Sequence, residues 1–179
     1  MTVSIRAAVP GDGTMLHDVA GRTFRLACPP GTTLADITEF VRSELSVDRF
    51  EDYLADPDRR LLVAEDSGGA VGYAMLVSGA PTDADVTAVV TERPAIELNK
   101  FYLLATAHGS GAATTLMTAA IDSARAAGAS VLWLGVNQVN GRANRFYEKS
   151  GFAIVGTKQF ALAGRFEDDF VRALVIGPR

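Results

Sequence analysis

The fold of this chain is decided by residues 97–117, ELNKFYLLATAHGSGAATTLM. An apolar run of strand length, 97–104, leads into a turn of small residues, 108–111, and strong helix formers follow over 112–127. A helix N-terminus binds anions, because its first amides are unpaired and lie at the positive end of the helix dipole. Gly109 and Gly111 lack Cβ atoms, so phosphate oxygens can approach the backbone closely. The segment predicts a pyrophosphate cradle, although a connection that binds nothing fits this stretch equally well.

A second stretch, residues 131–152, has the sequence VLWLGVNQVNGRANRFYEKSGF. It predicts a buried strand over 131–136 and then a short helix. Asn140 is the expected N-cap of this helix, and Gly151 the expected C-cap.

Together the two stretches resemble the GNAT family of acyl-CoA-dependent N-acetyltransferases. The cradle motif of the family, Arg/Gln-x-x-Gly-x-Gly/Ala, falls on His108, Gly111 and Ala113. The more specific signature, Asn-x-x-Ala-x-x-Phe-Tyr-Glu-Lys-x-Gly-Phe, falls on Asn140, Ala143, Phe146, Tyr147, Glu148, Lys149, Gly151 and Phe152. A looser resemblance is to the PaiA-like polyamine acetyltransferase branch, through residues 97–102, 133–136 and a closing pair of strands over 156–176.

The resemblance implies an α/β acyl-CoA N-acyltransferase fold, in which helices flank a mixed, mostly antiparallel sheet of about seven strands. We expect a single domain, 1–179, with its cofactor-binding core at about 95–152 and substrate-facing helices at about 12–56. The implied reaction transfers acetyl from acetyl-CoA to an amine by direct attack in a ternary complex, with neither a metal nor a covalent enzyme intermediate.

Proton transfer identifies two candidate catalytic residues. An amine with a pKa near ~10.4 is mostly protonated at pH 7, so a site that acetylates it gains from a base. Glu97, on the strand before the cradle, is the candidate base, although a solvent-facing carboxylate explains it equally well. The reaction also expels a thiolate, and a phenol that is protonated at neutral pH can reprotonate it. The resemblance assigns this acid role to Tyr147; the alternative is an aromatic side chain packed beside Phe146.

The resemblance also implies the cofactor contacts. Backbone groups of Tyr102, Leu103 and Leu104 would contact the pantetheine arm, where the strand splays from its neighbour. Amides of the cradle would bind the pyrophosphate; its residues are His108, Gly109, Ser110, Gly111, Ala112 and Ala113. Asn140, Phe146 and Lys149 complete the predicted set, although Asn140 is equally an ordinary helix cap and Lys149 a solvated lysine. The chain departs from the family pattern at two places: His108 stands where the family has Arg or Gln, and residues 112–113 contain no glycine. Both departures bear on the affinity for the cofactor.

Composition argues against several other classes. A net charge of −4, with Lys and Arg scattered along the chain, disfavours nucleic-acid binding. The single cysteine, Cys28, cannot form an internal disulfide, and we expect it to be packed rather than nucleophilic. No signal peptide or stretch of ~18 apolar residues is apparent, so we expect a cytoplasmic protein without a membrane partner. Self-association as a homodimer is also expected.

The remaining elements follow from periodicity and turn residues. We expect a strand over 3–9, helices over 12–26, 33–45 and 47–55, and a hairpin over 60–77. A closing hairpin is expected from strands 152–162 and 168–176, with its turn near Ala163, Gly164 and Arg165. Residues 79–94 are expected to be a long loop, either a mobile lid or, as we favour, a connection whose valines lie in the core.

The acceptor is the least determined feature. A polyamine needs carboxylates, which are available at Glu39, Glu44, Glu51 and Asp52 and in the closing hairpin at Glu167, Asp168 and Asp169. Other small amines, aminoglycosides, amino acids and a protein N-terminus stay open. The alternative from a different functional class is a domain that binds acetyl-CoA without turnover and serves as a sensor or interaction module. His17 has no evident partner in the sequence.

Overall fold

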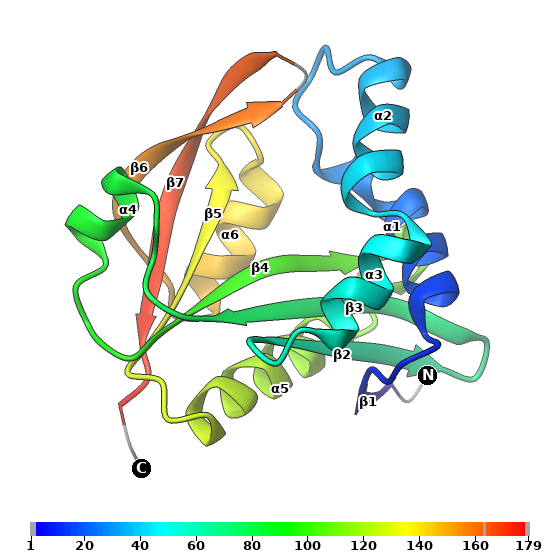
Figure 1. The fold of residues 1–179 in the computed structure, drawn as a ribbon, viewed down its shortest axis with the longest axis horizontal. Coiled ribbons are helices and arrows are strands. Elements are labelled where there is room, and N and C mark those ends of the chain that lie inside the picture. Colours follow the sequence, from blue (N-terminus) through cyan, green and yellow to red (C-terminus); the bar gives the residue numbers. More distant parts are fainter. Residues whose placement is uncertain (1–2, 163, 178–179) are drawn as a thin grey trace. The chain divides into compact units, whose positions relative to one another are not determined.

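The computed structural model describes residues 3–162 and 164–177. Its seven strands form one sheet in the order β1-β2-β3-β4-β5-β7-β6 (Figure 1). The strands are β1 (Ser4–Ala7), β2 (Arg59–Asp66), β3 (Gly69–Ser78), β4 (Ala95–Leu103), β5 (Val131–Asn137), β6 (Ala153–Leu162) and β7 (Arg165–Val175). The helices are α1 (Gly13–Ala27), α2 (Leu34–Glu44), α3 (Val47–Ala55), α4 (Ala84–Val89), the 3-10 helix η1 (Ala105–Ala107), α5 (Ala112–Ala126) and α6 (Gly141–Lys149).

The sheet is mixed, as expected. Strands β4 and β5 are parallel, whereas β1 with β2, β5 with β7, and β6 with β7 are antiparallel. The predicted fold class is therefore confirmed.

The chain divides into two compact units, and β3, β4 and α5 each contribute residues to both. Unit 1 comprises the described residues up to Leu76 together with Lys100–Ala120. Unit 2 comprises Val77–Asn99 and the described residues from Ile121 onward.

Unit 1 holds the first three helices, which have the predicted positions. Their apolar side chains recur at helical spacing, as in α1, where Leu16, Val19 and Ala20 are buried. Helix α2 begins with a capping box between Thr33 and Asp36. Figure 1 shows α1 beside α2 and α3.

Helix α1 receives its N-terminal cap from another helix. The Asp12 carboxylate accepts hydrogen bonds from Arg6 Nη1 at 2.7 Å and from the Val9 amide at 2.9 Å, and it caps no amide of α1. Instead Glu51 of α3 accepts hydrogen bonds from the amides of Gly13, at 2.8 Å, and Gly11, at 3.1 Å. A carboxylate at a helix N-terminus satisfies orphan donors and interacts favourably with the helix dipole. Glu51 therefore fixes α1 to α3.

Unit 2 contains a helix that the sequence analysis missed. Residues 84–89, expected to lie in a loop, form α4, and the Asp83 side chain caps it by accepting from the amides of Asp85 and Val86. The favoured expectation for the valines is confirmed, because Val86 and Val90 are fully buried in a cluster with Trp133 and Val171. Figure 1 shows α4 beside β6.

The closing hairpin of unit 2 is longer than predicted. Strand β7 begins at Arg165, three residues before the expected start. The β6 and β7 ladder runs from Ala153↔Ala173 to Leu162↔Arg165, with a bulge between Ile154 and Gly156. Of the three predicted turn residues, Ala163 lies outside the described residues, Gly164 adopts φ of +74°, and Arg165 already belongs to β7, so the turn is shorter than expected.

Candidate active site

The predicted cradle lies in unit 1 and presents unengaged backbone amides. Gly109 and Gly111 adopt φ of +82° and +89°, a left-handed conformation that favours glycine. The His108 amide donates to Ala105 O and the Ser110 amide to Ala107 O, while Ala112 N donates to Ser110 Oγ. Among the described residues, the amides of Gly109, Gly111 and Ala113 donate to no protein atom. The cradle therefore fits an anionic group such as a pyrophosphate.

The three residues predicted to contact the pantetheine arm lie at the end of β4, also in unit 1. Tyr102 and Leu103 belong to the strand, and Leu104 follows it. The Leu104 amide donates to Val71 O at 2.8 Å. The expectation of free backbone groups is therefore wrong for this amide.

The predicted acid lies on α6 in unit 2. Tyr147 is half-buried, and its ring packs against Phe146 and Phe152 with centroid distances of 5.6 and 6.0 Å. Asn140 is the N-cap, as predicted, because its Oδ1 accepts from Ala143 N at 3.1 Å. Lys149 is exposed at the last position of the helix. The helix ends one residue earlier than expected: Ser150 is its C-cap, and Gly151 follows with φ of +93°.

A buried arginine attaches α6 to β7. Arg172 is 5% exposed; its Nε donates to Asn144 Oδ1 at 3.1 Å and its Nη1 to Phe152 O at 3.0 Å. Asn144 in turn donates to the carbonyls of Asn137 and Asn140. The guanidinium therefore bonds to Asn144 in the first half of α6 and to Phe152, two residues after the C-cap, and Tyr147 lies between these two residues in the sequence.

The predicted base also lies in unit 2. Glu97 of β4 is half-buried and accepts a hydrogen bond from Asn99 Nδ2 at 3.1 Å. It is the last residue of β4 that pairs with β5, opposite Trp133. The next pair on this face would be Asn99 of β4 and Gly135 of β5. These two residues are not paired in the ladder between β4 and β5. The two strands therefore separate just beyond Glu97.

A second carboxylate lies on the same face of the sheet. Cross-strand partners project to one face, so Glu97, Trp133 and Ala173 share a face, and Asp169 shares it because it is an even number of residues from Ala173. We call this surface the Glu97 face. Asp169 is 8% exposed and pairs with Asn137 of β5 and with Lys158 of β6.

Asp169 lies over a glycine in an environment that disfavours its charged form. A Cβ atom on Gly135 would be 3.3 Å from Asp169 Oδ2 and 2.8 Å from Lys158 Cε, so both side chains lie over this exposed glycine. Burial raises the pKa of the Asp169 carboxyl to about 6, although Lys158 acts in the opposite direction. Within residues 3–162 and 164–177, no hydrogen bond or ion pair to this carboxylate is present.

Three of the other six carboxylates proposed for the acceptor have structural partners. Glu39 forms an ion pair with Arg42 at 2.6 Å, Glu44 pairs with Arg49 at 3.6 Å, and Glu51 caps α1. Asp52 and Asp168 are exposed.

Cys28 is poorly suited to nucleophilic chemistry. Its Sγ donates to Phe24 O at 3.3 Å, and burial raises the pKa of the thiol to about 11. It is therefore protonated at neutral pH, in line with the expectation of a packed side chain.

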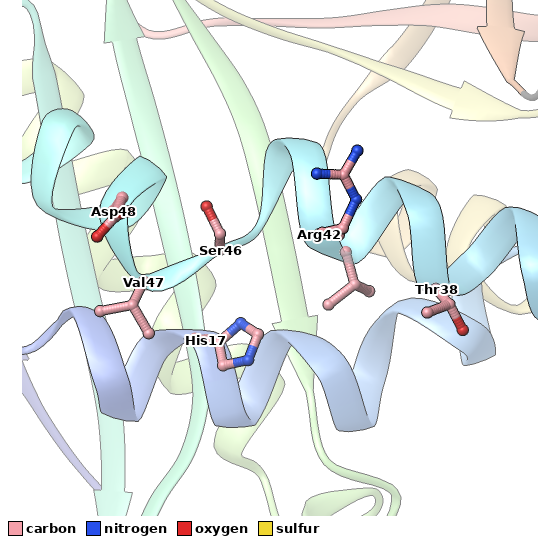
Figure 2. A pocket seen from close by; sticks show the side chains of 7 residues that line it. His17, Thr38, Arg42, Ser46, Val47 and Asp48 are labelled. Atoms are coloured by element: carbon pink, nitrogen blue, oxygen red, sulfur yellow. The ribbon is translucent and has the colours of Figure 1, made fainter.

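The structure contains a cavity of about 450 Å³ in unit 1 that holds none of the predicted site residues. Figure 2 shows its lining, with His17 from α1 facing the segment around Ser46 and Val47. His17 has a partner that the sequence did not reveal, because its Nδ1 lies 2.7 Å from Leu45 O.

Sequence reasoning missed Arg172 and Asn144, and it grouped Asp169 with two acidic neighbours. Strand alternation is the one signal that separates Asp169 from Asp168, because adjacent strand residues face opposite sides. Nothing in the local sequence marks Arg172, whose partners are 20 and 28 residues away. In the part of the chain that the structure describes, no helix is long and apolar enough to cross a membrane, and no group of three His, Cys, Asp or Glu residues is arranged to hold a metal.

Comparison with known proteins identifies the family. Residues 27–152 match the Acetyltransferase (GNAT) family. An uncharacterized N-acetyltransferase of Mycobacterium tuberculosis is 46% identical over 160 residues, which cover 89% of this chain and 95% of that protein. The PaiA N-acetyltransferase of Thermoplasma acidophilum, solved in complex with coenzyme A, superposes with a TM-score of 0.76 at 19% identity, covering 98% of this chain and 99% of that one. YncA of Salmonella typhimurium, a putative acetyltransferase solved with its cofactor acetyl-CoA, gives 0.67 at 18% identity, covering 100% and 96%. These two likenesses concern the fold, whereas the family match and the 46% identity carry the conclusion that the chain belongs to the GNAT acetyltransferase family.

Proposed function

We propose that this N-acetyltransferase transfers acetyl from acetyl-CoA to a small-molecule amine, such as a polyamine, by direct attack in a ternary complex. The observation that carries the donor assignment is the cradle, where Gly109, Gly111 and Ala113 present unengaged amides at the start of α5. Such amides suit a pyrophosphate. The two solved fold neighbours described above carry coenzyme A and acetyl-CoA, which supports the same donor.

The proposed cofactor residues follow the family motif. The cradle residues 108–113 bind the pyrophosphate, and the backbone of Tyr102 and Leu103 with the Leu104 carbonyl binds the pantetheine arm. Asn140, whose Oδ1 is engaged as a cap, contributes its amide nitrogen. Phe146 and Lys149 complete the set; Lys149 is exposed, as a phosphate contact requires. When bound, acetyl-CoA supplies the acetyl group as a thioester.

Two side chains move protons in the proposed reaction. Glu97 accepts a proton from the acceptor ammonium, directly or through water, and so provides the neutral amine that attacks. Tyr147 donates its Oη proton to the leaving thiolate, since a phenol with a pKa near ~10 stays protonated at neutral pH. The half-buried position of both side chains supports these roles.

The proposed acceptor, a cationic amine, follows from the carboxylates that are available to bind it. Glu39, Glu44 and Glu51 already have partners within the protein. Among the remaining candidates, Asp169 on the Glu97 face is the buried carboxylate. A cationic small-molecule amine suits such a site better than an anionic acceptor. Acetylation of a protein N-terminus and binding of acetyl-CoA without turnover are the alternatives; a binder needs neither Tyr147 nor Glu97. Assembly as a homodimer also stays a prediction.

The test is release of free thiol from acetyl-CoA in the presence of spermidine, spermine, aminoglycosides, amino acids and short peptides. We expect turnover with the polyamines. Turnover with peptides alone would contradict a small-molecule acceptor and indicate a protein N-terminus instead. Binding of acetyl-CoA with no turnover of any amine in the panel would contradict the enzymatic proposal and favour the binding module.

A further inference from the structure

The Glu97 face changes from apolar to polar along the strands of unit 2. Its apolar part, which includes Trp133 and Val171, packs in one buried cluster with Val86 of α4 and with Val90, the C-cap of that helix. Beyond Trp133 the face carries Gly135 and Asn137 on β5, Asp169 on β7 and Lys158 on β6. Glu97 lies at the boundary, where β4 and β5 separate. The polar part therefore begins where the proposed chemistry takes place.

Within this polar part, Asp169 differs from an ordinary surface carboxylate. Surface aspartates are solvated or paired, whereas Asp169 is 92% buried and has no hydrogen-bond or ion-pair partner among the described residues. An ionised carboxylate in such a place loses part of its hydration, which favours uptake of a proton. The side chain reaches solvent beside Gly135, which is itself exposed.

We propose that Asp169 is a second proton acceptor of the acceptor site, which shares with Glu97 the removal of the ammonium proton and takes it from the polar part of the Glu97 face. The inference rests on the proposed function. In this step one N–H bond of the ammonium breaks and an O–H bond forms on Asp169, while the electron pair stays on nitrogen. The proton later passes to solvent beside Gly135.

The surrounding charges are consistent with this role. Lys158 from β6 faces the carboxylate and lowers its pKa, Glu167 and Asp168 on its own strand raise it, and β5 contributes the uncharged Gly135 and Asn137. Burial outweighs these effects, so the pKa of the Asp169 carboxyl lies at about 6. A general base is most effective when its pKa lies near the working pH. At pH 7 this carboxylate is mostly ionised and able to accept a proton.

The first experiment is the pH profile of kcat/KM with the best amine from the panel. For the wild type we expect an acidic limb near pH 6. Asp169→Asn removes one of the two proton acceptors, so kcat/KM should fall by about 10-fold or more and the limb near pH 6 should disappear. Asp169→Glu keeps a carboxylate and should retain part of the rate with a shifted limb. Asp58→Asn is the control, because this exposed aspartate has no part in the proposed site, and it should stay within about twofold of the wild type.

A second readout does not depend on turnover. Carboxyl-carbon NMR of the ligand-free protein, assigned by the loss of one resonance in Asp169→Asn, should show a group that titrates near pH 6. A wild type that acetylates amines while Asp169→Asn keeps its rate and its acidic limb would overturn the inference and leave the proposed function intact. Titration of this resonance near pH 4 would also overturn it. Failure of the wild type with every amine would instead contradict the proposed function.

Discussion

At the scale of single residues, Tyr147 is the side chain whose role is most directly tested. Tyr147→Phe removes the Oη proton but keeps the ring that packs on Phe146 and Phe152. If the hydroxyl protonates the leaving thiolate, kcat should fall by about 10²-fold or more. Affinity for coenzyme A, measured by calorimetry, should change little. An unchanged kcat would remove Tyr147 from the mechanism.

The raised pKa of Asp169 also leads to a prediction about the pH dependence of stability. Its pKa is raised by folding from 3.8 to about 6, so the fold favours the protonated form. Its stabilising contribution is fully present below pH 3.8 and is lost as the pH rises through about 6. Asp169→Asn keeps an uncharged side chain at every pH.

The variant should therefore gain stability relative to the wild type between pH 4 and pH 7, by at most about 3 kcal/mol. Urea unfolding at several pH values measures this difference, and Asp58→Asn, at an exposed position that does not act on Asp169, provides the flat reference. A difference that does not vary with pH would show that the environment of Asp169 is not the one described here.

At the scale of elements, the N-terminus of α1 depends on Glu51. Glu51→Ala leaves the amides of Gly13 and Gly11 without their acceptor, and loss of such a cap costs about 0.5–2 kcal/mol. Asp52→Ala changes the adjacent, exposed carboxylate and should alter the free energy of unfolding by less than about 0.5 kcal/mol. Urea titrations followed by circular dichroism compare the two, and equal effects would mean that the cap contributes nothing.

Helix α6 depends in the same way on Arg172. In Arg172→Lys one ammonium replaces a fork that bonds to both Asn144 and Phe152, so at least one buried acceptor loses its donor. We expect a loss of about 1–3 kcal/mol in the free energy of unfolding. We also expect kcat to fall, because α6 carries Tyr147. Arg145→Lys, on the exposed side of α6, should change neither quantity appreciably. A stable Arg172→Lys protein with normal kcat would show that the fork does not position the helix.

At the scale of the whole molecule, donor binding should raise the melting temperature. A ligand at about 100 times its Kd adds about 2.7 kcal/mol, which for a chain of this size corresponds to roughly 5–10 °C. Thermal melts with acetyl-CoA and coenzyme A measure this shift. Dephospho-coenzyme A, which retains the pyrophosphate, should still stabilise the protein, whereas pantetheine should stabilise it much less. Equal shifts with pantetheine would contradict a cradle that binds the pyrophosphate.

Local sequence patterns were sufficient for most elements but not for contacts between strands. Caps such as Thr33 and Asn140, and the apolar period of α1, placed the helices within a few residues. Helix α4 was missed because it has only six residues, although its Asp83 cap and the spacing of Val86, Val89 and Val90 are helical. The special position of Asp169 depends on a register set by residues distant in the chain, Asn137 and Lys158. No local pattern encodes that register.

The cap that Glu51 provides for α1 has a consequence for biosynthesis. The capping carboxylate lies 38 residues after Gly13, so it does not yet exist when the first helix leaves the peptidyl-transferase centre. At about 5–20 residues per second, the ribosome needs about two to eight seconds to add it. During that interval the N-terminal turn of α1 has no acceptor from α3, and the nascent chain completes this turn only after α3 has been translated.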